Sequence, residues 1–331
     1  MSILVAGAGG FIGGQLVRSL EQQGISILAV DRKPLGEWYY RSSLAENRVS
    51  DLQDKGACSI VTRGVSHVYN LAADMGGMGF IENNKALCML SVLINTQLLL
   101  ASRDNGVKRF FFSSSACVYP DYRQKQTHIE ALKESDAYPA MAEDGYGWEK
   151  LFSERMCRHF REDFGIATRI GRYHNVYGPY GTWDGGREKA PAAIARKVAT
   201  ALISGKREIE IWGDGEQTRS FMYIDDCLKG TQLLMNSNFV EPLNIGSDEM
   251  VSINELVDIV ENIAGIKLER IYKRDAPMGV RGRNSDNTLI RQVLGWAPSV
   301  KLVDGMEKTY RWIYDQTMAR AEGREFVAAY E

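Results

Sequence analysis

A glycine-rich turn near the N-terminus constrains this chain more than any other feature. Residues 2–31 read SILVAGAGGFIGGQLVRSLEQQGISILAVD, with Gly7, Gly10 and Gly13 between an apolar run and an amphipathic segment. A second apolar run follows, and this order predicts a βαβ unit. Glycines in its first turn let the backbone approach a pyrophosphate, and the N-terminus of the helix then favours the anion. We therefore predict a dinucleotide site.

Asp31 ends the second apolar run and favours NAD over NADP as the dinucleotide. A carboxylate at this place accepts hydrogen bonds from a ribose 2′-hydroxyl and repels a 2′-phosphate. Arg32 and Lys33 follow directly and keep NADP as an alternative. The further residues that we expect beside the cofactor lie in the same turn or after later strands: Phe11, Ile12, Asp51, Leu52, Leu71 and Ala72.

Apolar segments continue to alternate with helical ones through the first half of the chain. Residues 65–73, 107–115 and 166–174 read as strands, whereas residues 83–106 and 146–165 read as helices that end at glycines. Strands that are apolar throughout and alternate with helices indicate a parallel sheet that is covered on both faces. We predict an α/β fold with a Rossmann-like, doubly wound parallel sheet.

The pattern changes after Tyr173, where the loops lengthen and short strands mix with helices. We predict an NAD-binding domain from residues 1–172, joined by residues 220–246. A smaller, mixed α/β substrate-binding lobe would comprise residues 173–219 and 247–331. Since no proline-rich linker or low-complexity run separates them, we expect the two lobes to pack closely.

The composition bears on partners and location. The 331 residues contain 40 Lys and Arg against 42 Asp and Glu, a net charge of -2, so no bulk attraction to nucleic acid or an anionic membrane is expected. Polar residues interrupt the most apolar window, residues 87–101, and no cleavable N-terminal segment is apparent. The five cysteines are scattered without a CxxC pair, which favours reduced thiols over disulfides or a metal site. We expect a cytoplasmic, metal-free protein.

A tyrosine and a lysine four residues apart are the first candidate catalytic groups. Tyr146 and Lys150 share a helix face, and Ser115 ends the preceding strand. The spacing alone proves nothing, since about one such pair is expected by chance. Together the three groups can remove a proton from an alcohol while a hydride leaves its carbon. For this the tyrosine pKa must fall from about 10 by roughly three units, or about 4 kcal/mol, and we expect Lys150 and a nicotinium charge to lower it.

These motifs together resemble the extended short-chain dehydrogenase/reductase family, whose members act on nucleotide sugars. The resemblance covers nearly the whole chain and includes the glycine-rich turn, NLAA, YxxxK, NVYGP and GDGEQTRSFMYIDD. Longer strings resemble the 3,5-epimerases of this family: LAADMGGMGFI, SSSACVYP, LKESDAYPA, GTWDGGREKAPAA, GVRGRNSDN and LGWAP. The resemblance implies NAD as cofactor, GDP-mannose as substrate, and GDP-L-galactose or GDP-L-gulose as product. It also implies a homodimer, formed through the helices that contain Leu98 and Phe152.

Cys117, in SSSACVYP, departs from the related enzymes. In 4-epimerases of the family this position resembles a threonine, and in 4,6-dehydratases the pair at Ala116 and Cys117 is Asp-Glu, whose Glu is the C5 base. A thiol is a competent base once it is partly ionised, and a nearby cation lowers its pKa from about 8.5. We interpret Cys117 as a base at the sugar, with a packed, inert thiol as the alternative.

Inversion at a carbon requires a second group on the opposite face of the sugar. The resemblance assigns this role to Lys189, in GGREKAP, and implies that Glu188 orients it or holds a sugar hydroxyl. Oxidation of C4 to a ketone makes the hydrogens on C3 and C5 acidic, so Cys117 and Lys189 can exchange protons there before the hydride returns. Which of the two groups gives and which takes at each carbon is left open.

The other expected substrate contacts rest on charge and resemblance together. A guanidinium can bridge two phosphate oxygens, so Arg219 and Arg281 are expected at the diphosphate and ribose. Arg283 is either a second phosphate contact or a surface charge, and Asp74 and Gly77 would help to shape the sugar pocket. The remaining candidates for substrate contact are Gly76, Ser115, Asn175, Glu188, Lys189, Lys197 and Gln217.

Other functions on the same fold are alternatives. A 4-epimerase or a 4,6-dehydratase would leave Cys117 idle, and a 4-epimerase would incorporate no deuterium from heavy water. A 3,5-epimerase must incorporate deuterium at C3 and C5. A non-catalytic dinucleotide-binding regulator usually lacks the Tyr or the Lys of the triad, and both are present here.

Overall fold

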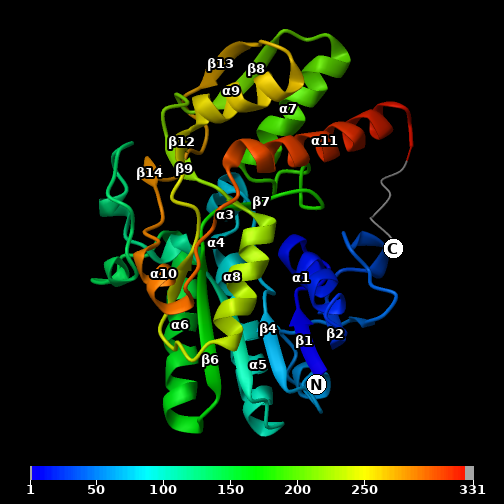
Figure 1. Ribbon diagram of the computed structural model, residues 1–331, viewed down its shortest axis with the longest axis vertical. Coiled ribbons are helices and arrows are strands. Elements are labelled where there is room, and N and C mark those ends of the chain that lie inside the picture. Colours follow the sequence, from blue (N-terminus) through cyan, green and yellow to red (C-terminus); the bar gives the residue numbers. More distant parts are fainter. Residues whose placement is uncertain (1, 325–331) are drawn as a thin grey trace.

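The computed structural model describes residues 2–324 and contains a central parallel sheet with helices on both faces (Figure 1). All neighbouring strands in this seven-stranded sheet run parallel, in the order β11-β6-β5-β4-β1-β2-β3. The predicted doubly wound fold is confirmed. In sheet order the strands are β11 (Leu243–Ile245), β6 (Ala167–Tyr173), β5 (Arg109–Ser115), β4 (His67–Asn70), β1 (Ser2–Ala6), β2 (Ser26–Asp31) and β3 (Glu46–Val49).

Alternate residues of β1 enter two different hydrophobic cores. Ile3 and Val5 pack on the side of α1 and α8, whereas Leu4 and Ala6 pack on the side of α2, α5 and α6. Such alternation follows from the two-residue period of a strand, and both faces must therefore be apolar. The helices that cover the sheet are α1 (Phe11–Glu21), α8 (Ile224–Asn236), α2 (Lys55–Val61), α5 (Ser91–Asp104) and α6 (Asp144–Phe164).

The helix predicted over residues 83–106 is present as two consecutive helices, α4 (Lys85–Met89) and α5, after the short α3 (Met78–Asn83). Leu90 keeps helical dihedral angles between them, so the axis is only slightly interrupted. By length and composition alone, Lys85–Asp104 is apolar enough to cross a bilayer. In its most apolar window 44% is buried inside the protein, and core helices of soluble proteins can have the same length and composition.

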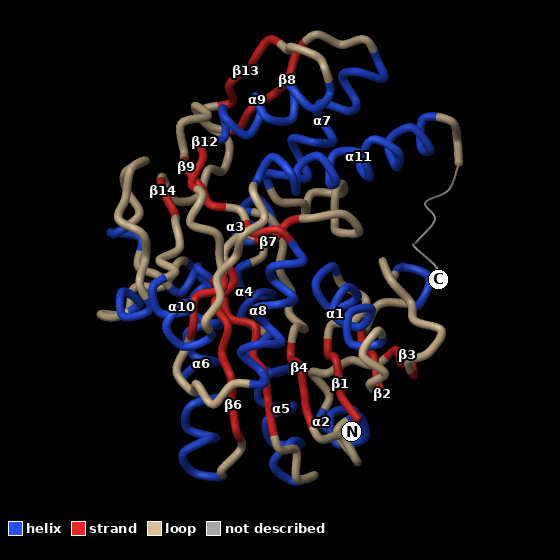
Figure 2. The backbone as a smooth tube through the Cα atoms, viewed as in Figure 1, coloured by secondary structure: helices blue, strands red, loops and turns tan. Residues whose placement is uncertain are grey.

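A second layer of short strands and helices lies beyond the carboxyl ends of the central strands, as Figure 2 shows. β8 (Glu208–Trp212) and β13 (Glu269–Lys273) form one parallel pair, and β7 (Val176–Tyr177) pairs with β10 (Met222–Tyr223). A third sheet has the order β12 (Met250–Ser252), β9 (Thr218–Ser220), β14 (Gly282–Arg283). The helices here are α7 (Ala190–Ser204), α9 (Ile253–Ala264) and α11 (Leu302–Ala321), whereas α10 (Thr288–Leu294) contacts β11 of the central sheet.

One hydrophobic core extends through both parts, so they pack directly against each other and are not tethered by a linker. This core contains Val5 and Leu16 from the sheet side and Val198, Leu256 and Ile313 from the second layer. β11 belongs to the segment that we expected to rejoin the first domain, and it pairs with β6. The exact division into residues 1–172 with 220–246, and 173–219 with 247–331, stays a prediction, and residues 325–331 lie outside the described residues.

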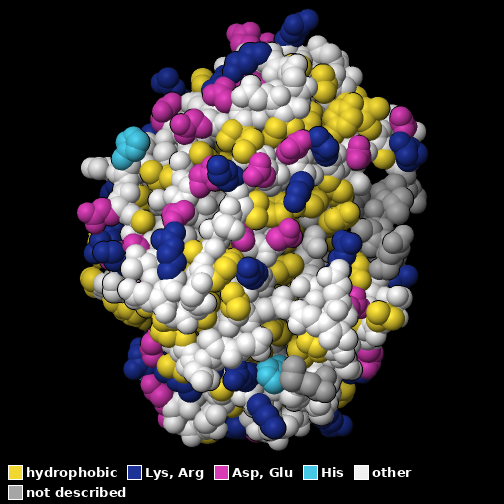
Figure 3. All heavy atoms as spheres, viewed as in Figure 1, with side chains coloured by type: hydrophobic (Ala, Val, Ile, Leu, Met, Phe, Trp, Pro, Cys, Tyr) yellow, Lys and Arg dark blue, Asp and Glu magenta, His cyan; other side chains and the backbone are white. Residues whose placement is uncertain are grey.

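Charges of both signs are interspersed on the face of the molecule shown in Figure 3. No part of that face gathers a large field of Lys and Arg or of Asp and Glu. This agrees with the nearly balanced composition. An anionic ligand must therefore be bound by local groups within a site.

Candidate active site

The glycine-rich turn has the close backbone packing that a dinucleotide site requires. Gly7 has a φ of 84°, and a Cβ atom there would lie 2.8 Å from the backbone nitrogen of Ala72. At Gly13 a Cβ atom would lie 2.1 Å from the Gly7 carbonyl oxygen, so no side chain fits. α1 begins at Phe11 after Gly10 without a side-chain cap, which leaves its first N–H groups for an anion. The turn thus fits the pyrophosphate of NAD.

The Asp31 carboxylate stands at the carboxyl end of β2, as expected for a ribose ligand. Its Oδ2 atom accepts a hydrogen bond from the Gly9 nitrogen and its Oδ1 atom one from the Lys33 nitrogen, both at 3.0 Å. The guanidinium of Arg32 donates a hydrogen bond to the Asp74 carboxylate at 2.6 Å. Arg32 is therefore engaged elsewhere, which favours NAD over NADP.

The other residues expected at the adenosine end lie at neighbouring strand ends. Asp51 is exposed and its Oδ1 atom accepts from the Gln53 nitrogen at 2.9 Å, as in a turn, while Leu52 is buried. Leu71 and Ala72 follow β4 and pack with their backbone against Gly7. Whether these residues contact the cofactor stays a prediction.

Ser115, Tyr146 and Lys150 meet at the carboxyl end of β5. Tyr146 lies in the first turn of α6, is almost fully buried and hydrogen-bonds to the Ser115 hydroxyl. The Lys150 Nζ atom lies 5.5 Å from the centre of the Tyr146 ring and 4.8 Å from that of Phe112. The three groups that the motif predicts to act together are thus assembled.

The pKa of Tyr146 is raised in the protein alone. Burial raises it well above its usual value of 10, and the charges of Cys117 and Glu149 add to this rise. The Glu149 carboxylate lies 3.5 Å from the Lys150 Nζ atom and offsets part of the ammonium charge. The fall that we expected from Lys150 and the nicotinium charge together stays a prediction, because the raised pKa is that of the protein alone.

Cys117 lies in η2 (Ala116–Val118), directly after Ser115. Its side chain is in one buried cluster with Tyr146 and Ile81, and the residue is 8% exposed. The Sγ atom lies 3.6 Å from Nη1 of Arg283, and the Glu143 carboxylate hydrogen-bonds to both the thiol and Arg283.

The pKa of the Cys117 thiol is raised rather than lowered. Burial is the main cause, the Glu143 carboxylate adds to it, and the Arg283 guanidinium opposes both. Although burial acts the other way, Arg283 lowers the pKa of Glu143, which therefore stays ionised. As expected, a nearby cation lowers the thiol pKa, but burial and the Glu143 carboxylate outweigh it.

Sequence reasoning left Arg283 open and did not consider Glu143. Arg283 is buried because β14 pairs with β9 and so enters the interior, where its Nε atom donates to Gln124 at 2.7 Å. Glu143 is the residue before α6, and its backbone nitrogen donates to the Cys117 carbonyl at 2.8 Å. The only hint in the sequence was that Arg281 and Arg283 lie close together. Nothing in the sequence pointed to Glu143.

Lys189 is the residue before α7, close enough to Cys117 for their charges to interact. Burial lowers the pKa of its ammonium, while the thiolate of Cys117 opposes this change. Glu188 does not orient Lys189 as expected, because its carboxylate binds Arg196 Nη2 and the Gly186 nitrogen, both at 2.7 Å. Within residues 2–324 the ammonium has no hydrogen-bond or ion-pair partner.

Of the expected phosphate ligands, Arg219 lies on β9 and Arg281 directly precedes the neighbouring strand β14. Arg219 is buried on β9, and its Nη2 atom donates to the carbonyls of Val280 at 2.6 Å and Met278 at 3.1 Å. Burial and the charge of Arg283 lower its pKa to about 9. Arg281 binds both carboxylate oxygens of Asp214, at 2.9 and 3.1 Å.

The remaining candidates are each in contact with other parts of the protein. Lys197 donates to the Glu210 carbonyl at 2.8 Å, and the amide nitrogen of Gln217 donates to the Trp212 carbonyl at the same distance. The Asn175 amide donates to the Ser220 carbonyl at 3.1 Å. A Cβ atom at Gly76 would lie 2.8 Å from Phe80, so this glycine is packed closely. That these residues bind substrate stays a prediction.

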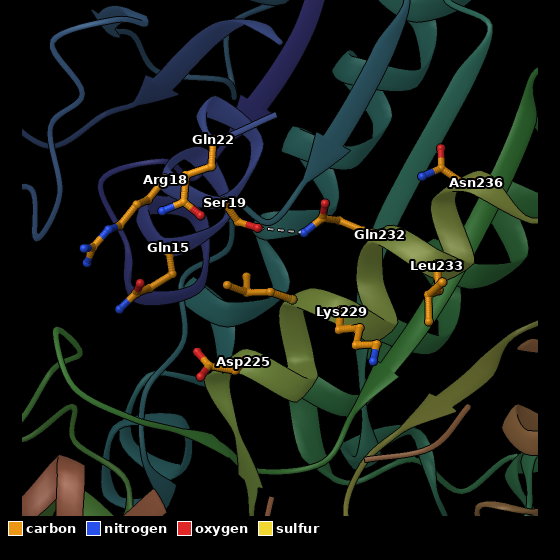
Figure 4. Close-up of a pocket in the computed structure, with 10 residues that line it drawn as sticks. Gln15, Arg18, Ser19, Gln22, Asp225, Lys229, Gln232, Leu233 and Asn236 are labelled. Atoms are coloured by element: carbon orange, nitrogen blue, oxygen red, sulfur yellow. Dashed lines mark hydrogen bonds between the residues drawn. The ribbon is translucent and has the colours of Figure 1, made fainter. Parts of the chain in front are cut away.

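A groove of about 540 Å³ between α1 and α8 lies apart from these residues (Figure 4). Gln232 donates across it to the Ser19 hydroxyl at 3.0 Å. None of the candidate site residues lines it. Its lining is mostly polar and consists of Gln15, Arg18, Ser19, Gln22, Asp225, Leu228, Lys229, Gln232, Leu233 and Asn236.

Known proteins share both the sequence and the fold. The NAD dependent epimerase/dehydratase family matches residues 3–246. The chain is 51% identical over 317 residues to GDP-mannose 3,5-epimerase 1 of Oryza sativa subsp. japonica, with 96% of this chain and 82% of that protein covered. It is 50% identical over 317 residues to GDP-mannose 3,5-epimerase of Arabidopsis thaliana, with 96% and 83% covered.

Among solved structures, UDP-glucose 4-epimerase with UDP-glucose from Thermotoga maritima has a TM-score of 0.87 at 26% identity, over 96% of this chain and 99% of that chain. UDP-glucuronic acid 4-epimerase from Bacillus cereus, in complex with UDP-glucuronic acid and NAD, has a TM-score of 0.79 at 26% identity. There the covered shares are 96% and 100%.

Proposed function

Because the chain belongs to the NAD dependent epimerase/dehydratase family, we propose that it epimerises a nucleotide sugar at C3 and C5 through a transient 4-keto sugar. The membership expected from the motifs is confirmed. The substrate is GDP-D-mannose and the product GDP-L-galactose, with GDP-L-gulose when only C5 inverts. The observation that carries the proposal is the burial of Cys117 and Tyr146 in one cluster, which sets a carbon base beside the group for the C4 hydroxyl. The enzyme is an isomerase, a 3,5-epimerase.

The cofactor is NAD, and the protein supplies its binding groups. Gly7, Gly10 and Gly13 leave room for the pyrophosphate, and Asp31 accepts the ribose hydroxyls. Bound NAD would supply the redox chemistry, the reversible transfer of a hydride. Lys150 would hold the nicotinamide ribose, and its ammonium, 5.5 Å from the centre of the Tyr146 ring, stabilises a phenolate there.

Tyr146 performs the first proton transfer. Its phenolate takes the proton of the C4 hydroxyl, and Ser115, which already hydrogen-bonds the phenol, holds that hydroxyl in place. The C4 carbon becomes a carbonyl. Hydrogens on C3 and C5 are then α to this carbonyl, and their removal leaves an enolate rather than an unstabilised carbanion.

Cys117 and Lys189 carry out the inversion. One group takes the proton from the carbon, and the electron pair of that C–H bond moves into the enolate. The other group then gives a proton to the opposite face, and the enolate collapses to the ketone. The lowered pKa of Lys189 supports this role, because an amine that loses its proton more readily can act in either direction.

The test uses the wild-type protein in heavy water with a panel of GDP-mannose, UDP-glucose and UDP-glucuronic acid. We expect conversion of GDP-mannose alone, with deuterium at C3 and C5 of the products. Conversion of a UDP-sugar at C4 without deuterium would establish a 4-epimerase instead. Binding of NAD without conversion of any of the three sugars would favour a non-catalytic regulator.

We also propose that two copies of the chain form a homodimer through α4, α5 and α6. These helices pack against one another and expose apolar side chains to solvent. Such a patch is costly in a monomer and typical of an interface. The exposed side chains are Met89, Leu90, Leu93, Trp148 and Phe152. Light scattering should give twice the mass of one chain, and Phe152→Asp should give a monomer, whereas a monomeric wild-type protein would exclude this interface.

A cytoplasmic location, without a membrane anchor, is proposed as well. The five cysteines are all free and buried, which supports a reducing compartment. Fractionation of cells that express the full chain would test this, and recovery with membranes would contradict it.

A further inference from the structure

The loop before Lys189 is not restricted to one backbone conformation by its own residues. The loop joins β7 to α7 and contains Gly185 and Gly186, which have positive φ values of 90° and 84° and open space around them. Glycines of this kind leave the backbone many conformations. Since Lys189 has no bonding partner of its own within residues 2–324, the contacts of its neighbours decide where the ammonium stands.

Arg187 makes three contacts to the segment Asp74–Phe80, which follows β4. Its carbonyl oxygen accepts a hydrogen bond from the Gly77 nitrogen at 3.0 Å. Its guanidinium lies 3.9 Å from the centre of the Phe80 ring, and Nη1 lies 3.8 Å from Oδ1 of Asp74. Arg187 thus contacts this segment through a backbone hydrogen bond, a cation–π contact and an ion pair.

The segment that receives these contacts is itself firmly held. The Asp74 backbone nitrogen donates a hydrogen bond to the Ser91 Oγ atom at 2.9 Å. The Asp74 carboxylate accepts a hydrogen bond from the Arg32 guanidinium at 2.6 Å. At Gly77 a Cβ atom would lie 2.4 Å from the Glu188 carbonyl oxygen, so the two backbones are in close contact. The segment Asp74–Phe80 therefore connects β4, which ends beside the glycine-rich turn, to Glu188, the residue next to Lys189.

We propose that Arg187 is a positioning residue for Lys189, because it fastens the loop to the segment Asp74–Phe80 and so places the ammonium opposite Cys117. This inference rests on the proposed function. Each contact of an exposed guanidinium is weak alone, and three contacts from one side chain and its backbone define one geometry. A displacement of about 1 Å at a reacting group can lower a rate about a hundredfold.

The alternative role for Arg187 is that of a phosphate ligand, since its side chain is 43% exposed. The two roles differ in what they change. Loss of a ligand weakens the binding of GDP and raises KM, whereas loss of a positioning group lowers the rate of inversion and leaves binding unchanged.

The experiment compares Arg187→Gln with the wild-type protein on GDP-mannose in heavy water. At a carbon where Cys117 removes the proton, the thiol can still return a deuteron to the same face when Lys189 is displaced. We therefore expect deuterium to enter recovered GDP-mannose at nearly the wild-type rate, while inverted product falls about tenfold or more. The ratio of exchange to inversion is a quantity that a general loss of structure would not raise.

Two further variants serve as references. Arg187→Lys keeps the charge and should recover part of the inversion, and Arg311→Gln, on α11 with a 73% exposed side chain, should change nothing. An unchanged ratio of exchange to inversion in Arg187→Gln, or weakened binding of GDP, would overturn the inference. A wild-type protein that does not epimerise would instead overturn the proposed function, so the two failures are distinct.

Discussion

The Nη1 atom of Arg283 lies 3.6 Å from the Sγ atom of Cys117, across a sequence separation of 166 residues. The same guanidinium binds the Glu143 carboxylate, which also hydrogen-bonds the thiol. Cys117 therefore has a cation and an anion as direct neighbours. Because the cation favours the thiolate and the anion the thiol, this pair sets the pH range in which Cys117 can take a proton.

Opposite shifts of the Cys117 pKa are expected on removal of the two neighbours. Glu143→Gln should lower the thiol pKa and Arg283→Gln should raise it, because a single charge at close range is lost in each variant. The rate of alkylation of the Cys117 peptide, followed by mass spectrometry against pH, reports this pKa. Shifts in the same direction for both variants would contradict the electrostatic account.

Cys117→Ala should abolish inversion and leave the oxidation of C4 intact. A general acid or base contributes about a hundredfold to ten-thousandfold in rate, so the product should fall by at least the lower figure. Absorbance of reduced nicotinamide should still appear on addition of GDP-mannose. Cys58→Ala, which removes a buried thiol outside the cluster that holds Cys117, is the matched control, and equal losses in both variants would make the thiol structural.

Tyr146→Phe should stop the reaction before any proton leaves C3 or C5. Without the phenol the C4 hydroxyl keeps its proton, and the ketone that acidifies the neighbouring carbons does not form. We expect a loss of about a hundredfold or more in deuterium uptake at both carbons. Tyr122→Phe, at an exposed position, should behave as the wild type. Deuterium uptake in Tyr146→Phe without oxidation would exclude the 4-keto route.

Asp31→Asn should weaken the binding of NAD and reduce its preference over NADP. Hydrogen bonds to a charged group contribute about 1.5–3 kcal/mol, and repulsion of the 2′-phosphate is lost as well. Because Arg32 stays bonded to Asp74, gain of NADP binding should be small. Calorimetric titration with both dinucleotides measures this, with Asp104→Asn as the control. Unchanged NAD affinity would remove Asp31 from the cofactor site.

The buried His174 should make the protein less stable in acid. Burial lowers its pKa to about 3, and its Nε2 atom hydrogen-bonds to Oδ1 of Asn244 at 3.0 Å. In the unfolded chain the pKa is about 6.5, so the unfolded state binds the extra proton between these values. The contribution of His174 to the free energy of unfolding is complete above about pH 6.5. It is lost as the pH falls towards about 3, at up to roughly 1.4 kcal/mol per pH unit.

Urea unfolding of the wild type and of His174→Gln between pH 7 and pH 4 tests this assignment. The variant should show a smaller decline of its unfolding free energy with falling pH, whatever its stability at neutral pH. Parallel declines would mean that other groups cause the acid sensitivity.

The elements that could be predicted from the sequence are those with local signals. The glycine-rich turn, the helix with Tyr146 and Lys150, and the strand that ends at Ser115 each carry their pattern within a few residues. β9, β12 and β14 have two or three residues each, too few for any periodicity to appear. The interruption at Leu90 was also missed, because its neighbours keep the apolar pattern of one helix.

The charges around Cys117 illustrate what the sequence could not provide. Arg283 reaches the thiol only because β14 pairs with β9, and Glu143 only because α6 begins beside η2. Both are consequences of tertiary packing. The sequence also could not reveal the burial that raises the pKa values of Tyr146 and Cys117, since desolvation depends on neighbours that lie far apart in the chain.

β14 and β11 lie late in the chain, and this order matters during synthesis. The ribosome releases the glycine-rich turn, Cys117 and Tyr146 well before Arg283 emerges, and the outermost strand of the sheet also follows them. A prematurely ended polypeptide thus holds the groups for hydride chemistry without the guanidinium that flanks its sulfur. A polypeptide that ends before residue 283 therefore lacks the cation beside Cys117.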